Sequence, residues 1–211
     1  MREGNNMKIK ESNFEEKLIK SEEVFKGKLL KLTVNEVELP NKNITEREVV
    51  SHPGAVAIVP VTSKDEVVMV RQYRFAIKRH TLELPAGTLK KAEKPIGCAK
   101  RELEEEIKMR ARKWEKLITI YPSPGYCNEK IHIFLARELE DLSKKGDKGK
   151  NVGDVQENIK SLGKSQTKVK KYEKDEFINK IIISLKEAKD KILSGEITDS
   201  KTIVGIMIVS E

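Results

Sequence analysis

Cysteine, aromatic residues and long apolar runs are all scarce in this chain of 211 residues, of which 5% are aromatic. The two cysteines, Cys98 and Cys127, cannot form a disulfide framework and lack the spacing of a metal site. We therefore expect both to be small buried hydrophobes in a protein of the reducing cytoplasm. No stretch of about 18 apolar residues is present, so we expect no membrane span. The N-terminal segment MREGNNMKIKES has no apolar core, so we do not expect a secretory signal.

Positive charge is in excess, with a formal net charge of +8 and a pI near 9.3, which raises the question of a nucleic-acid partner. Residues 144–171 hold nine lysines against three acids and so carry +6 of this charge. The same segment contains four glycines, no arginine and no aromatic residue that would stack against bases. We therefore expect a long solvated loop, inserted at about 142–171, and no nucleic-acid partner.

The length fits one large domain, or a core domain with a smaller extension. Strand character is present at residues 22–39, 46–51, 55–61, 66–73, 114–121, 131–136 and 177–183. We expect residues 55–61 and 66–73 to pair as a hairpin. Helices are expected at residues 11–20 (unless this is a frayed arm), from Pro95 to about Ile107, after Ser184, and from Asp199 through Val209. This mixture indicates an α/β or α+β layered core.

Acidic residues cluster within residues 87–109. Glu102, Glu105 and Glu106 have the spacing i, i+3, i+4 and so share one face of the expected helix. Carboxylates this close repel one another, and a divalent cation would remove that repulsion. Their hard oxygen atoms favour Mg²⁺ or Mn²⁺ over zinc. The alternative is a solvated acidic helix face with no ligand.

The stretch 87–109 resembles the Nudix box, which is a glycine, five residues, a glutamate, seven residues and then R-E-U-x-E-E-x-G-U, where U is aliphatic. Eight positions are in register: Gly87, Glu93, Arg101, Glu102, Leu103, Glu105, Glu106 and Met109. Lys108 replaces the second glycine of the pattern, so we expect it to adopt a positive φ at a cost of roughly 1 kcal/mol, or the helix to end differently.

The resemblance implies a Nudix-type α/β/α sandwich around a mixed sheet, with an N-terminal β extension. It further implies that the Ala86 carbonyl joins the three acids as a metal ligand, with Glu105 also counted as catalytic. Gly87, Glu93 and Arg101 would support this site, since Gly87 permits a tight turn and the other two have opposite charges.

Flanking segments resemble the ADP-ribose pyrophosphatase subgroup. They are Leu82–Gly87 (LELPAG), Arg71–Arg74 (RQYR), and Pro124, which lies fifteen residues past Met109. The resemblance covers residues 24–140 and 172–209. It implies Mg²⁺-dependent hydrolysis of the pyrophosphate bond of ADP-ribose, or of a related nucleoside diphosphate sugar, to AMP and ribose 5-phosphate.

Arg74 is the candidate phosphate contact, because a planar guanidinium suits phosphate oxygens. Arg47 and Glu48 are secondary candidates for binding the adenosine end. Pro124 and Gly125 are further substrate candidates, and the candidate general bases implied by the resemblance are Glu173 and then Glu176.

The family also implies a homodimer, in which residues 1–52 form a dimerising strand extension and residues 53–211 the hydrolase domain. Two alternatives stay open. One is a Nudix hydrolase of another substrate, such as a dinucleoside polyphosphate, coenzyme A or an oxidised nucleotide. The other is a non-catalytic Nudix-fold nucleotide-binding module, which the intact box carboxylates disfavour.

Overall fold

The computed structural model describes residues 14–143 and 178–210. The chain divides into two compact units, which are described separately below. Unit 1 runs to Ala55 and includes residues 119–131, and unit 2 contains residues 56–118 and the chain from His132 onward. In the described residues, the model contains no helix with the length and apolarity needed to cross a membrane.

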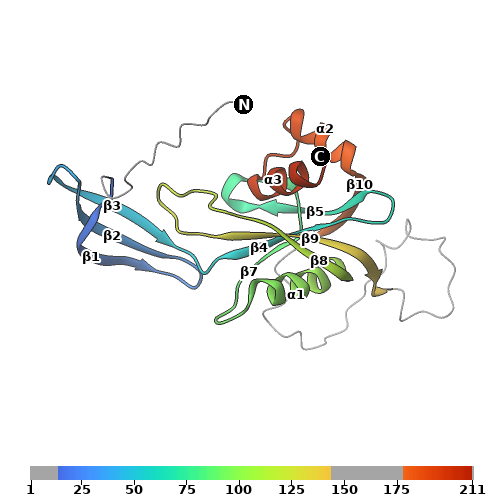
Figure 1. Cartoon of the computed structure of the whole chain (residues 1–211), viewed down its shortest axis with the longest axis horizontal. Coiled ribbons are helices and arrows are strands. Elements are labelled where there is room, and N and C mark those ends of the chain that lie inside the picture. The colour runs from blue at the N-terminus through green and yellow to red at the C-terminus, as the bar shows by residue number, and fades with distance from the viewer. Residues whose placement is uncertain (1–13, 144–177, 211) are drawn as a thin grey trace, which may run out of the picture. The chain divides into compact units, whose positions relative to one another are not determined.

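Unit 1 contains an antiparallel three-stranded sheet in the order β1-β2-β3 (Figure 1). Its strands are β1 (Lys17–Lys26), β2 (Lys31–Glu38) and β3 (Ile44–Ser51). The expected helix at 11–20 is therefore wrong from Lys17 onward, while residues 11–13 lie outside the described part. Pairing with β2 gives this segment main-chain hydrogen bonds, whereas a helix this short is marginal without tertiary support.

The segment 119–131 is bound to β3 within unit 1. The Val50 amide donates to the Tyr126 carbonyl (2.7 Å), and the Asn128 amide donates to the Val50 carbonyl (3.1 Å). The Asn128 side chain also accepts from the His52 amide at 2.9 Å. These bonds fix the loop that carries Pro124 against the strand that carries Arg47 and Glu48.

Unit 2 contains, apart from a few strand ends, the two other sheets of the described residues. The first has the order β7-β4-β9-β8 and the second the order β10-β5-β6. The strands are β4 (Ala55–Pro60), β5 (Glu66–Arg74), β6 (Arg79–Glu83), β7 (Ala86–Thr88), β8 (Met109–Ile120), β9 (Ile131–Asp141) and β10 (Asn179–Ser184), with a 3-10 helix, η2 (Phe75–Ile77), between β5 and β6.

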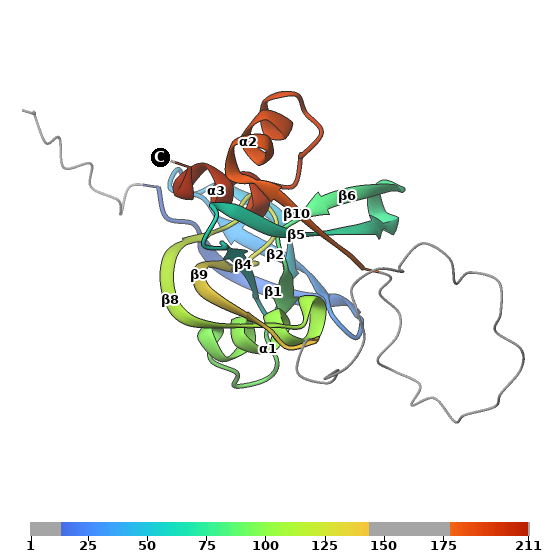
Figure 2. The same cartoon turned by 90° about the vertical axis from the view of Figure 1, so that its right-hand side faces the viewer.

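Helices cover both sides of these sheets. They are α1 (Pro95–Ile107), α2 (Leu185–Leu193) and α3 (Ser200–Val209). Figures 1 and 2 show α1 on one side of the strands of unit 2, and α2 and α3 on the other. The expected α/β/α layering is thus confirmed.

The expected hairpin of residues 55–61 and 66–73 is wrong. Strand β4 lies between β7 and β9 in one sheet, and β5 lies between β10 and β6 in the other. Only one isolated bridge, from Val61 to Val67, joins the two segments. Because both edges of β4 are already paired, β5 has no edge on β4 to which it can bond.

A buried core fixes α1 in place. Leu103 and Ile107, one helical turn apart, pack with Val56, Val68 and Phe134 of the strands. Burying a leucine side chain of this kind stabilises the fold by about 1.5–3 kcal/mol. Since one face of α1 is committed to this core, the acidic residues lie on its remaining faces.

The ends of the helices follow the expected signals. Pro95 lies in the first turn of α1, and Lys108 ends this helix with a φ of 57° and an amide that donates to the Leu103 carbonyl. Ser184 caps α2 by accepting from the Glu187 amide, and Asp199 caps α3 by accepting from the Thr202 amide. The positive φ expected at Lys108 is therefore confirmed.

Candidate active site

The junction of β7 with α1 brings the loop backbone against the acidic face of the helix. The Ala86 amide donates to Glu106 Oε2 at 3.1 Å. Gly87 lies so close to Glu102 that a Cβ added there would be 2.0 Å from the Glu102 carboxyl carbon. A glycine is therefore required at 87 for Glu102 to occupy its present position, and the requirement comes from space rather than from the backbone angle.

Arg101 is the central cation of this junction. Its Nε and Nη2 atoms donate to the two oxygens of Glu93 at 2.9 and 3.0 Å. Its Nη1 atom donates to Glu102 Oε1 at 2.5 Å and to Glu105 Oε2 at 3.0 Å. The hydrogen bonds from Arg101 and from the Lys90 amide lower the pKa of Glu93 to about 2. The ion pair expected between Glu93 and Arg101 is thus present, and it joins the loop to the helix.

The donor atoms at the junction suit a hard divalent cation. Carboxylate and carbonyl oxygens are the ligands that Mg²⁺ and Mn²⁺ prefer. Within residues 14–143 and 178–210, no three histidine, cysteine, aspartate or glutamate side chains already form a cluster that could hold a metal ion. Arg101 instead pairs with Glu102 and Glu105, and its single positive charge leaves the cluster with Glu93 negative overall. The Glu105 side chain is 56% exposed, so it can turn from Arg101 toward a cation without disturbing the core.

Cys98 lies beneath the same junction as a neutral thiol. Its sulfur is 3.2 Å from Arg101 Nη2 and 3.6 Å from the Thr88 carbonyl oxygen. Burial raises the pKa of this thiol to about 12. The expectation of a buried hydrophobe is therefore confirmed for Cys98, whereas Cys127 is only partly buried.

Arg74, the candidate phosphate contact, forms a bidentate ion pair with Glu83. The distances are 2.8 Å from Nε to Oε1 and 2.6 Å from Nη2 to Oε2. The Glu83 side chain is 2% exposed and also accepts from Thr81 and Lys201. Burial alone would raise the pKa of Glu83, but hydrogen bonds from Arg74 and the charge of Lys201 outweigh it and lower the pKa to about 2.

Sequence reasoning missed Glu83 and Lys201 as functional candidates. The available signal was the position of Glu83 between two leucines, four residues before Gly87. The structure buries both leucines. A charged residue in such a place requires charged or polar partners. Nothing in the local sequence identified Lys201 as that partner.

The other candidates fall outside this junction. In unit 1, Arg47 pairs with Glu16 at 2.6 Å, and Glu48 lies opposite Val34 in the sheet. Pro124 and Gly125 lie in the loop bound to β3. Glu173 and Glu176 lie outside the described residues, as does residue 144 onward of the lysine-rich insertion. The structure thus brings together Ala86, Gly87, Glu93, Arg101, Glu102, Glu105 and Glu106.

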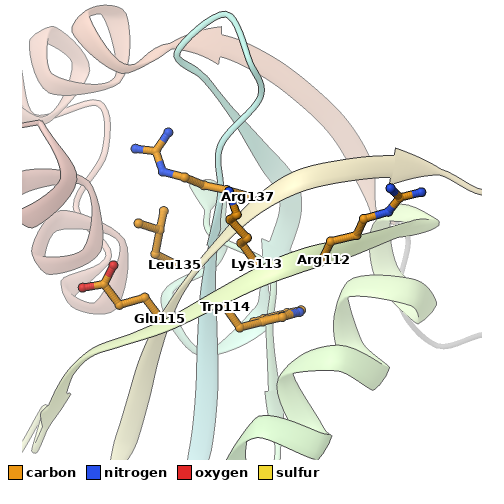
Figure 3. Close-up of a pocket in the computed structure, with 6 residues that line it drawn as sticks. All are labelled: Arg112, Lys113, Trp114, Glu115, Leu135 and Arg137. Carbon is orange, nitrogen blue, oxygen red and sulfur yellow. The ribbon is translucent and has the colours of Figure 1, made fainter.

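A separate hollow of about 450 Å³ lies along β8 and β9 (Figure 3). Its lining residues are Arg112, Lys113, Trp114, Glu115, Leu135 and Arg137. Lys113 already pairs with Glu138 at 2.6 Å, and Arg137 approaches Asp65 at 4.0 Å. Trp114 points away from Arg137 in Figure 3 and stacks edge-on against Phe134. None of the box acids lines this hollow, so we do not assign the site to it.

The chain is similar to known proteins in sequence and in fold. A family model described as the NUDIX domain matches residues 51–177. An "ADP-ribose pyrophosphatase" of Bacillus subtilis is 38% identical over 92% of this chain and 92% of its own length. A "Methanol dehydrogenase activator" of Bacillus methanolicus is 40% identical over 92% of this chain and 91% of its own. A crystal structure titled "ADP compounds hydrolase" shares the fold, with a TM-score of 0.70 at 18% identity over 92% of both chains.

Proposed function

The chain belongs to the Nudix family, and from this premise we propose that it hydrolyses the pyrophosphate bond of ADP-ribose or a related nucleoside diphosphate sugar. For ADP-ribose and water, the products are AMP and ribose 5-phosphate. A pyrophosphatase named for ADP-ribose matches the chain over nearly its whole length, which supports this substrate. The observation that carries the proposal is the meeting of Ala86 and Gly87 with Glu102 and Glu106 at one loop–helix junction.

We propose Mg²⁺ or Mn²⁺ as the cofactor, held by the Ala86 carbonyl and by Glu102, Glu105 and Glu106. Such an ion neutralises charge on phosphate oxygens and promotes ionisation of water. The chain itself supplies the positioning. Gly87 admits Glu102 to the loop, and Arg101 joins Glu102 and Glu105 to Glu93.

Arg74 is proposed to contact a substrate phosphate. Glu83 holds two of its guanidinium nitrogens and thereby fixes the plane of the group, while the Arg74 side chain is still 41% exposed. A guanidinium held in this way loses little further freedom when it binds an anion. Glu173 is proposed as the general base that accepts a proton from the attacking water, with Glu176 as the second candidate. Both assignments rest on the resemblance alone.

Unit 1 is proposed to bind the adenosine end of the substrate and to form a homodimer. Arg47 and Glu48, the candidates for the adenosine end, belong to this unit, as do the substrate candidates Pro124 and Gly125. All ten residues of β1 are exposed, among them the apolar Leu18, Ile19, Val24 and Phe25. An exposed edge strand with large apolar side chains is suited to covering by a second copy.

The division into an extension (1–52) and a hydrolase domain (53–211, with its insertion at about 142–171) also stays a proposal. Residence in the cytoplasm is proposed because both cysteines are free thiols, which suits a reducing compartment.

A substrate panel tests the function. Purified protein is incubated with ADP-ribose, a nucleotide sugar of another base, a dinucleoside polyphosphate, coenzyme A and an oxidised nucleotide, each with Mg²⁺ and with a chelator. We expect Mg²⁺-dependent release of AMP from ADP-ribose to be fastest. Faster turnover of another compound would reject the substrate, and nucleotide binding without any turnover would favour the non-catalytic module.

A further inference from the structure

A buried ionic cluster joins α3 to the strand that leads into the box. Lys201 Nζ lies 2.5 Å from Glu83 Oε2 and 2.8 Å from Asp199 Oδ1. The side chains are little exposed, at 2% for Glu83, 10% for Lys201 and 19% for Asp199. Lysine is almost never buried unless it is paired, so this arrangement needs an explanation.

A second link runs through the main chain. The Leu84 amide donates to Thr202 Oγ1 at 2.9 Å. The Thr202 hydroxyl and amide in turn donate to Asp199 Oδ2 at 2.5 and 3.0 Å. Asp199 therefore both caps α3 and orients the hydroxyl that holds Leu84, while its other oxygen holds Lys201.

The segment after Glu83 is consequently held from three sides. Leu84 is bound to α3 through Thr202, the Pro85 carbonyl accepts from the Ile58 amide of β4 at 2.9 Å, and the Ala86 amide donates to Glu106 of α1. These three contacts hold three consecutive residues, and the last of them is Ala86, whose carbonyl is proposed as a metal ligand.

The cluster is better suited to fixing geometry than to raising stability. Taking charges out of water costs free energy, and apolar residues of the same volume often serve stability equally well. Glu83 accepts four hydrogen bonds, from two nitrogens of Arg74, from Thr81 and from Lys201, which accounts for its acceptor capacity. With all four bonds made, the carboxylate has one orientation, and Arg74 has one as well.

We propose that Lys201 is a positioning residue of the hydrolase site, which locks Glu83 and thereby the backbone from Leu84 to Ala86 against the box. This inference rests on the proposed function for its catalytic consequence, but the locking itself can be measured without substrate or metal. Lys201 does not touch the reacting atoms and acts through Glu83.

Amide hydrogen exchange and steady-state kinetics test the proposal together. Lys201→Met removes the charge and keeps most of the volume, and Lys201→Arg restores a cation. Lys191→Met is the matched control, since Lys191 pairs with Glu196 at 2.8 Å on α2, away from the box. We expect Lys201→Met to speed exchange at the Leu84 and Ala86 amides at least tenfold, with no change at the core amide of Val68. We also expect kcat for ADP-ribose to fall about 10²-fold with a smaller change in KM, the scale of loss that follows a misplacement of about 1 Å.

Lys201→Arg is expected to recover part of both effects, and Lys191→Met to show neither. Unchanged exchange at Leu84 and Ala86, or an equal rise at Val68, would overturn the proposal, because the second result means a general loosening. If Lys201→Met does not fold, Lys201→Gln, which keeps a hydrogen-bond donor but loses the charge that holds Glu83, is judged by the same exchange criterion. Failure of the wild type to cleave ADP-ribose would reject the proposed function, while the exchange data would still decide the role of Lys201.

Discussion

Replacing Gly87 by alanine is expected to abolish most activity with a moderate loss of stability. The backbone at 87 is not in the left-handed region, so alanine causes no backbone strain there. The conflict lies entirely with Glu102, since the new Cβ would be 2.0 Å from the carboxyl carbon and 2.3 Å from Cγ. Carbon atoms in contact need about 3.5–4.0 Å, so the carboxylate must shift by about 1.5 Å or more.

This displacement sets the magnitude of the effect. A misplacement of about 1 Å in a catalytic constellation costs about 10²-fold in rate, so we expect kcat to fall by at least that factor. Glu102 would also leave its 2.5 Å hydrogen bond with Arg101, and a bond to a charged group contributes about 1.5–3 kcal/mol. Replacing glycine by alanine returns about 0.4–1 kcal/mol through the unfolded chain. The net loss in the free energy of unfolding is therefore expected to be about 0.5–2.5 kcal/mol.

Steady-state hydrolysis of ADP-ribose with Mg²⁺, together with urea unfolding, measures both quantities. Gly97→Ala is the matched control, because a Cβ at Gly97, also in the box, would meet nothing within 4 Å. We expect this control to keep wild-type kcat. A wild-type kcat in Gly87→Ala would show that the position of Glu102 does not limit activity. An equal loss of kcat in Gly87→Ala and Gly97→Ala would show that the effect is not specific to Glu102.

The remaining predictions concern the helix acids, the seat of α3 and the buried glutamate. Glu106→Gln keeps an oxygen for the Ala86 amide and should fold, yet its kcat should fall by about 10²-fold or more. The control is Glu104→Gln, at a neighbouring residue that pairs with Arg110, and it should not affect kcat. Equal kinetics of the two variants would contradict the assignment of Glu106 to the metal site. Gly205→Ala should lower the free energy of unfolding, measured in urea titrations, by about 1–3 kcal/mol despite the higher helix propensity of alanine. The reason is that the new Cβ would lie 2.7 Å from a Leu84 methyl. A gain in stability would show that α3 can accommodate the methyl group without a clash. Folding lowers the pKa of Glu83 from 4.5 to about 2, so ionised Glu83 contributes up to about 3 kcal/mol to the free energy of unfolding above pH 4.5, and this contribution is lost as the pH falls toward 2. The free energy of unfolding of the wild type should therefore fall more steeply with decreasing pH than that of Glu83→Gln. Parallel pH profiles of the two proteins would argue against this contribution.

Local signals in the sequence were sufficient for α1, α2 and α3, but not at residues 11–20, where the expected helix is a strand from Lys17 onward. A proline in the first turn, a residue in the left-handed region at the end and two capping side chains each act within a few residues, and α1, α2 and α3 begin and end accordingly. The pairing of strands is not local. Residues 55–61 and 66–73 were expected to pair because they are adjacent in the chain, but β7 and β9 take both edges of β4.

The candidate site divides in the same way. Fixed spacing predicted the acids of α1 and the partner of Arg101, and the family expectation is confirmed by the match to residues 51–177. The cluster of Glu83 with Lys201 was missed because its members are 118 positions apart. The roles of Glu173 and Glu176 stay predictions, as they lie outside the described residues.

Electron paramagnetic resonance of Mn²⁺ in the absence of nucleotide measures whether Glu102, Glu105 and Glu106 hold the divalent cation. The wild type is compared with the triple variant Glu102→Gln, Glu105→Gln, Glu106→Gln, and circular dichroism confirms that both are folded. We expect saturable binding by the wild type that the triple variant lacks. Equal binding by the two proteins would contradict this expectation, because the ion would then be held by other residues.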